Sequence, residues 1–63
     1  MREITMIFDA AETASIKVLD TGTYVTERQG DDSRTWVSIS TPDELIGMYR
    51  EDGYRLYSDR TFA

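Results

Sequence analysis

The sequence contains no cysteine, no histidine and no asparagine. Without cysteine or histidine, neither a disulfide nor a thiolate or imidazole metal site can stabilise the fold, and zinc chemistry and the common nucleophile–base pairs of enzymes are excluded. Without asparagine there is no N-glycosylation acceptor. The sequence also lacks an apolar run long enough to span a bilayer, and its start lacks the apolar segment of a signal peptide. These absences predict a soluble, cytoplasmic, non-enzymatic protein with no catalytic residues, no metal and no cofactor.

Size and charge narrow the class further. The 63 residues allow one domain, close to the lower size limit for folding without disulfides or metals, while 40% hydrophobic residues indicate a folded chain. The formal net charge is -5 and the pI is about 4.4. We therefore expect no direct binding of nucleic acid and no membrane attachment, because both begin with cations that neutralise phosphates. A protein partner with a basic surface would match this charge, although moderate acidity also simply keeps a small protein in solution.

The clearest structural signal is a helix between Thr41 and Gly53. Thr41 and Glu44 have the spacing of a capping box, and Pro42 suits the first helical position because it has no N–H to leave unpaired. Gly53 is the expected left-handed stop. The apolar stripe of this helix consists of Leu45, Met48 and Tyr49, with Ile46 at its edge. So short a helix must dock on an apolar surface, which has to come from residues 1–40.

Alternation of apolar and polar residues predicts strands on both sides of the helix. The predicted strands are 3–9, 14–19, 23–28, 34–40 and 54–58. Residues 10–13 are read as a turn, although Asp9 and Glu12 have capping-box spacing and a helix over residues 10–19 stays as the alternative. Residues 59–63 are expected to fray. The sequence thus predicts a single α+β domain, residues 1–63, with a small antiparallel sheet of four to five strands and one short helix on one face (β-β-β-β-α-β).

The same alternation assigns side chains to the two faces of the sheet. The face toward the helix is expected to carry Ile4, Met6, Phe8, Ile16, Val18, Val25, Val37, Ile39, Tyr54 and Leu56. The opposite face is expected to carry Ile7, Leu19, Tyr24, Trp36 and Tyr57, beside Thr5, Lys17 and Ser38. Exposed aromatic residues near arginine are typical of protein interfaces, so we predict that Tyr24, Trp36 and Tyr57 bind a protein partner or form a homodimer. The alternative is that they are scattered, or form a second small core under residues 29–33.

Acidic residues form a second candidate binding surface. Glu27, Asp31 and Asp32 surround one turn, and the pairs Asp43–Glu44 and Glu51–Asp52 lie at the helix ends. Such pairs imitate the spacing of phosphates, so the chain could act like a DNA mimic or a phage-type inhibitor that occupies a basic, nucleic-acid-binding site. Capping and turn formation explain the same residues without a partner. The spacing around Asp31 and Asp32 differs from that of an EF-hand loop, so we predict no calcium or magnesium site.

One short motif resembles an enzyme signature. Asp20-Thr21-Gly22, preceded by Val18-Leu19, resembles the Asp-Thr-Gly motif of retroviral-type aspartic proteases, and Leu45-Ile46-Gly47 is similar to their later apolar-apolar-Gly element. The resemblance implies a dimer in which two copies of Asp20 share a proton. The chain departs from the family because it is much shorter, has no segment for a flap, and carries Thr23 where a small residue is usual. Asp-Thr-Gly is also common in hairpin turns, which is the interpretation that we adopt.

Overall fold

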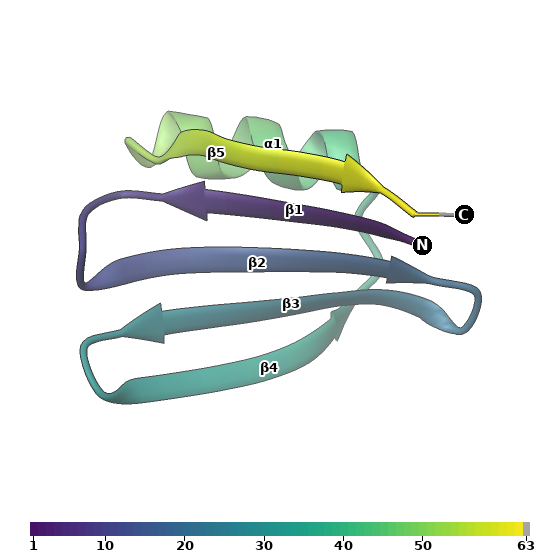
Figure 1. Cartoon of the computed structure of the whole chain (residues 1–63), viewed down its shortest axis with the longest axis horizontal. Coiled ribbons are helices and arrows are strands. Elements are labelled where there is room, and N and C mark those ends of the chain that lie inside the picture. The colour runs from purple at the N-terminus through teal and green to yellow at the C-terminus, as the bar shows by residue number, and fades with distance from the viewer. Residues whose placement is uncertain (63) are drawn as a thin grey trace.

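Figure 1 shows the computed structural model of the chain, whose described part covers residues 1–62. The elements follow one another in the predicted order β-β-β-β-α-β, which confirms the α+β fold class. They are β1 (Arg2–Ile7), β2 (Glu12–Leu19), β3 (Gly22–Gln29), β4 (Asp32–Ser38), α1 (Pro42–Glu51) and β5 (Arg55–Thr61). No helix among residues 1–62 is long and apolar enough to cross a membrane.

All five strands form one antiparallel sheet in the order β4-β3-β2-β1-β5. Hairpin turns join β1 to β2, β2 to β3 and β3 to β4. The helix α1 then returns the chain, so that β5 pairs with the free side of β1 (Figure 1). The register is fixed by the pairs Ile4–Ile16, Ile16–Val25, Val25–Trp36 and Ile4–Asp59. The first strand therefore lies inside the sheet, and β4 and β5 form its two edges.

The helix ends as the sequence predicts. The Glu44 N–H donates to Thr41 Oγ1 at 3.2 Å, and the Thr41 N–H donates back to Glu44 Oε1 at 3.0 Å, which completes the capping box. These hydrogen bonds to Thr41 hold the pKa of the Glu44 carboxyl below its usual value. At the other end, Gly53 has a φ of 95°, a left-handed conformation that glycine adopts without strain.

The helix lies on one side of the sheet, which we call the covered face; the opposite side is the open face. The buried core between helix and sheet consists of Ile4, Met6, Ala14, Ile16, Val25, Leu45 and Tyr49. Beside this core, Arg2 joins three elements on the covered face. It donates from Nε and Nη2 to Asp59 of β5 at 2.9 and 2.7 Å, and its Nη1 lies 3.8 Å from Asp43 of the helix.

Four apolar residues that the sequence assigns to the helix side are more exposed than expected. Val37 is 62% exposed because it lies opposite Tyr24, on the open face. Ile39 follows the last residue of β4 in the connection to the helix and is fully exposed, at 104%. Phe8 lies beyond the end of β1, with its ring 5.7 Å from that of Tyr54. Leu56 lies on the predicted face, opposite Met6, but on the edge strand, where the helix covers it only partly.

The sequence leaves residues 10–19 undecided between a strand and a helix, and the structure has the strand β2 there. β2 begins at Glu12, and the Asp9 carboxylate accepts from the backbone N–H groups of Ala11 and Glu12, each at 2.8 Å. Asp9 therefore closes a turn and does not cap a helix. At the other end, β5 extends to Thr61, beyond the expected end at residue 58, because it pairs with β1 along its length. The expected fraying of residue 63 falls outside the described residues.

Candidate functional site

The predicted aromatic site is divided between different parts of the molecule. Trp36 lies opposite Val25, whose side chain is buried under the helix, so Trp36 belongs to the covered face and not to the open face. Tyr24 lies on the open face opposite Val37. Tyr57 is on β5, at the other edge of the sheet. The face assigned to Trp36 was therefore wrong, and the structure does not bring the three rings together.

The length of one turn explains this correction. Only Gly30 and Asp31 separate the last pair of the β3–β4 hairpin, Gln29 and Asp32. This first pair fixes every other pair of the two strands, so odd-numbered residues of β3 lie opposite even-numbered residues of β4. Trp36 therefore lies on the same side as Val25. Sequence alternation alone does not specify this relation between two neighbouring strands.

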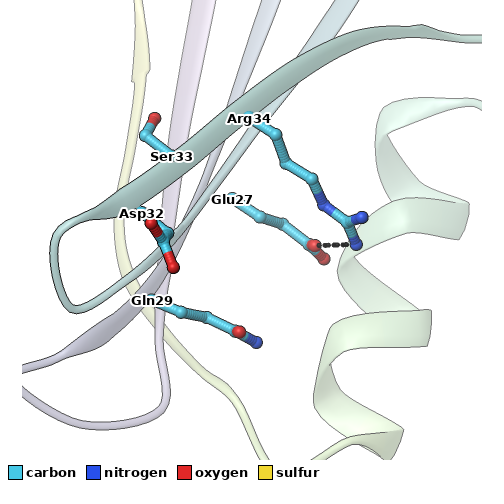
Figure 2. A pocket seen from close by; sticks show the side chains of 5 residues that line it. All are labelled: Glu27, Gln29, Asp32, Ser33 and Arg34. Atoms are coloured by element: carbon cyan, nitrogen blue, oxygen red, sulfur yellow. Dashed lines mark hydrogen bonds and ion pairs between the residues drawn. The ribbon is translucent and has the colours of Figure 1, made fainter.

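A chain of contacts joins Trp36 to the helix. The Arg34 guanidinium lies 5.4 Å from the centre of the Trp36 ring, within range of a cation–π contact. Arg34 Nη2 also donates to Glu27 Oε1 at 3.1 Å, and the Tyr49 hydroxyl donates to Glu27 Oε2 at 2.8 Å. Figure 2 shows Glu27 and Arg34 pointing from the sheet toward the helix. Burial, together with the Glu27 carboxylate, raises the pKa of the Tyr49 hydroxyl.

The acidic residues around this turn have different surroundings. Glu27 is occupied by Arg34 and Tyr49, whereas Asp31 and Asp32 are exposed in and beside the turn. The described residues, 1–62, contain no group of three or more acidic, histidine or cysteine side chains that could hold a metal ion. A small open hollow of about 90 Å³ lies over Glu27 and Arg34; Gln29, Asp32 and Ser33 complete its lining (Figure 2). It is well below the roughly 300 Å³ that small-molecule pockets need.

Asp20 of the Asp-Thr-Gly motif lies in the β2–β3 turn. The pair Leu19–Gly22 closes this turn, and Asp20 and Thr21 between them are exposed. The Thr21 hydroxyl lies 3.0 Å from the hydroxyl of Tyr24, which connects the turn to the open face. The motif therefore forms a hairpin turn within the chain.

The edge strand β4 is exposed along most of its length. We call Trp36, Val37 and Ile39 the β4 edge surface. Trp36 is 37% exposed on the covered face, Val37 projects from the open face, and Ile39 extends the surface past the end of the strand. Because bonded and non-bonded pairs alternate in an antiparallel sheet, alternate residues of β4 direct their N–H and C=O groups away from β3. Within residues 1–62 no strand pairs with this side of β4.

The open face carries a pattern that the sequence analysis missed. A row of hydroxyl side chains crosses all five strands at directly paired positions: Ser58, Thr5, Ser15, Thr26 and Thr35. Four cations lie at the neighbouring paired positions: Arg60 and Lys17 on one side of the row, and Arg55 and Arg28 on the other. Among the strand positions that the structure describes on this face, Glu3 is the one carboxylate. Only the register reveals this row, because its members are far apart in the sequence.

Comparison with protein-family models, with curated proteins and with solved structures finds no match for this chain.

Proposed function

We propose that the chain is a cytoplasmic, non-enzymatic protein-binding module that takes up an extended segment of a partner protein along the free side of β4. The observation that carries the proposal is the β4 edge surface, where apolar side chains flank an unpaired strand. Strand addition of this kind gains affinity from main-chain hydrogen bonds and specificity from alternate side chains. The lack of cysteine is compatible with a reducing compartment.

A comparison of the two sheet edges supports the choice of β4. Edge strands are usually protected from pairing by charges, prolines or bulges. β5 has such protection, because it carries Arg55, Asp59 and Arg60 and its pairing with β1 is interrupted by an irregularity between Thr5 and Met6. The charges of β4 lie in its first half, and residues 35–39 carry none. This second half is therefore available for a partner strand.

The two faces of β4 would contact alternate residues of an added strand. On the covered face the added strand would pass Trp36, whose ring is already held by Arg34. On the open face it would pass Val37, which lies against Tyr24 and Gly22. Tryptophan and arginine are frequent among the residues that dominate binding energy at protein interfaces. The partner that fits best is thus an extended segment with apolar residues at alternate positions.

The proposal is tested by measuring which partner proteins a tagged copy of the chain retains, with the unmodified protein and with variants of the β4 edge surface. Val37→Lys places a cation at the centre of the β4 edge surface, and Trp36→Ala removes its ring. Both should abolish retention of a partner that the unmodified protein retains, and binding should persist at high salt because the contacts are apolar. Tyr57→Ala is the matched control, since it removes a ring that is 70% exposed from the other edge. A partner retained equally by all three variants refutes the proposal.

The added strand can also come from a second copy of the chain, and a separate experiment tests for such a homodimer. Sedimentation equilibrium over a range of protein and salt concentrations would detect a homodimer. If β4 pairs with β4 of another copy, Val37→Lys should convert the dimer to monomer. A dimer that survives this change uses another surface.

The distribution of acidic residues favours a second candidate function. Asp43, Glu44, Glu51 and Asp52 are exposed on the helix, and Asp31 and Asp32 are exposed at the β3–β4 turn. This acidic side could occupy the basic site of a nucleic-acid-binding protein, as a phosphate mimic does. Binding would then weaken steeply with salt and with the double change Asp31→Asn/Asp32→Asn, and it would tolerate Trp36→Ala. Glu27 is excluded from this surface because its carboxylate is held by Arg34 and Tyr49.

A further inference from the structure

The charges of the molecule are separated onto different sides. Its formal net charge is -5, yet the strand positions of the open face carry Lys17, Arg28, Arg55 and Arg60 against the single carboxylate of Glu3. Within residues 1–62 the other carboxylates lie on turns, on the helix or on the covered face. The open face is therefore locally cationic on a protein that is acidic as a whole.

The arrangement of the open face follows from the paired positions. Neighbouring strands are about 4.8 Å apart, so the row places a hydroxyl group at each step across the sheet. The hydroxyls of Thr26 and Thr35 are hydrogen-bonded to each other at 2.8 Å. Residues two apart along a strand are separated by about 7 Å, which sets the backbone distance of Lys17, Arg28 and Arg60 from the row. Arg55 is three residues from Ser58, across the irregularity of β5. Lys17 and Arg60 lie on one side, with Glu3 between them and paired with both, and Arg28 and Arg55 lie on the other. The Arg28 Nε also donates to the Gly30 carbonyl at 3.2 Å. An extended chain of anions along the row would meet hydroxyls beneath it and a net positive charge on either side, the weaker one on the side of Glu3.

We propose that the open face binds single-stranded nucleic acid, with its phosphates along the hydroxyl row. Arginine, lysine, serine, threonine and tyrosine side chains are the groups that contact phosphates in nucleic-acid complexes. Tyr24 adds an aromatic ring beside Lys17, and its hydroxyl is held 3.0 Å from that of Thr21. Such a ring can stack on a base, which is how cationic grooves hold single strands without reading their sequence.

The geometry favours a single strand over other anionic partners. A sheet face can contact a cylindrical duplex over only part of its width, whereas a single strand can follow the whole row. An acidic polypeptide would use the cations and hydroxyls equally well but gains nothing from a base-stacking ring. A dimer that joined two open faces would bring like charges together.

The net negative charge of the molecule does not prevent this binding at physiological salt. Packed layers of secondary structure are about 10 Å apart, and the helix lies on the far side of the sheet. The Debye length at 0.15 M ionic strength is about 8 Å, so the acidic helix is largely screened from a ligand on the open face. With about four cations in contact, we expect weak binding with a dissociation constant of about 10⁻⁴ to 10⁻⁶ M. We also expect a logarithmic salt slope of about -2 to -3, since single strands give about -0.7 for each phosphate contact.

Fluorescence anisotropy with a labelled thymidine oligonucleotide of about 16 nucleotides tests the proposal, over about 20 to 200 mM salt. Lys17→Ala should weaken binding and reduce the salt slope by about 0.7. Arg50→Ala is the matched control, because it removes the same charge from the helix side and should leave the slope unchanged. No binding at the lowest salt, or equal losses from both variants, overturns the proposal.

The chemistry of the ligand is tested with a labelled poly-glutamate peptide of the same charge and with Tyr24→Leu. We expect the oligonucleotide to bind more tightly than the peptide, and Tyr24→Leu to weaken the oligonucleotide about fivefold or more while leaving the peptide unaffected. Urea denaturation of each variant checks that it is folded. If the peptide binds as tightly and the tyrosine has no effect, the open face accepts acidic polypeptides and the nucleic-acid proposal is wrong.

Discussion

The two faces of the sheet use neighbouring residues for different purposes. On the covered face, Ile4 and Ile16 are fully buried, and the helix adds Leu45. On the open face the adjacent positions, Thr5 and Lys17, carry a hydroxyl and a charge. Because side chains alternate along each strand, one short sequence supplies a core and a polar surface at the same time. Residues for stability and residues for binding are thus separated by a single step along the chain.

The largest difference is expected between Ile16→Ala and Lys17→Ala. Ile16 is fully buried, and removing its side chain should cost about 2–5 kcal/mol, because methyl groups and packing are lost. A domain of this size has about 3–5 kcal/mol of stability, so the variant should be largely unfolded. Lys17→Ala should change the free energy of unfolding by less than about 0.5 kcal/mol. Urea denaturation followed by circular dichroism measures both; comparable losses would show that the open face is also part of the core.

Tyr49→Phe tests the hydrogen bond that joins the helix to β3 on the covered face. Losing the hydrogen bond to Glu27 should cost about 1 kcal/mol at neutral pH. Burial and Glu27 raise the pKa of Tyr49, so the unfolded chain releases this proton near pH 10 while the folded chain keeps it. The stability is therefore constant below about pH 10 and falls as the pH rises above it. The phenylalanine variant should show a smaller alkaline loss in urea titrations from pH 8 to 11, with the remainder from Tyr54, whose pKa is raised chiefly by burial.

Asp59→Asn examines the charged border of the covered face. The hydrogen bond from Arg2 lowers the pKa of Asp59, so the folded state binds this proton less readily than the unfolded state. Its contribution is present above the unfolded pKa of about 3.9 and is lost as the pH falls through the lower folded value. The asparagine variant should lose less stability between pH 5 and pH 2 than the parent. Asp20→Asn, in an exposed turn, is the control and should retain the parent's acid sensitivity.

Thr26→Val should produce the smallest effect on stability. The hydroxyls of Thr26 and Thr35 lie 2.8 Å apart on the open face, where either can bind water instead. Valine keeps the β-branched shape that strands favour, so we expect a change within about 0.5 kcal/mol. A destabilisation of more than about 1 kcal/mol would mean that the hydroxyl row stabilises the sheet.

The sequence predicts the local features of the fold well. Thr41, Glu44 and Gly53 define the helix by interactions within a few residues. Alternation locates the five strands, although it left a helix over residues 10–19 as the alternative to β2. The face of Trp36 depends on how β4 pairs with β3, which is a relation between distant residues. Hydrophobicity suggested the wrong face because an edge strand is only partly covered on either side, so an exposed Val37 costs little.

The candidate sites were harder to predict for the same reason. Asp31 and Asp32 are exposed at the turn, as the sequence suggests, but the pairing of Glu27 with Arg34 and Tyr49 requires three elements to come together. The hydroxyl row likewise exists only when all five strands are in register. Net charge, which is a sum, cannot indicate that Lys17 and three arginines share one face.

The position of β1 inside the sheet has a consequence for how the chain folds. Arg2 pairs with Thr61, and the Phe62 N–H donates to the Met1 carbonyl at 2.7 Å. The first strand, β1, therefore gains its second neighbour only when the last strand, β5, is in place. While the chain is being synthesised, the β1–β4 meander has a second bare edge, at β1, until β5 emerges. Contacts between residues so far apart in sequence slow folding, because the intervening chain must be ordered first. Folding should therefore end with the closure of β5 onto β1, and the nascent protein is most prone to aggregation just before that step.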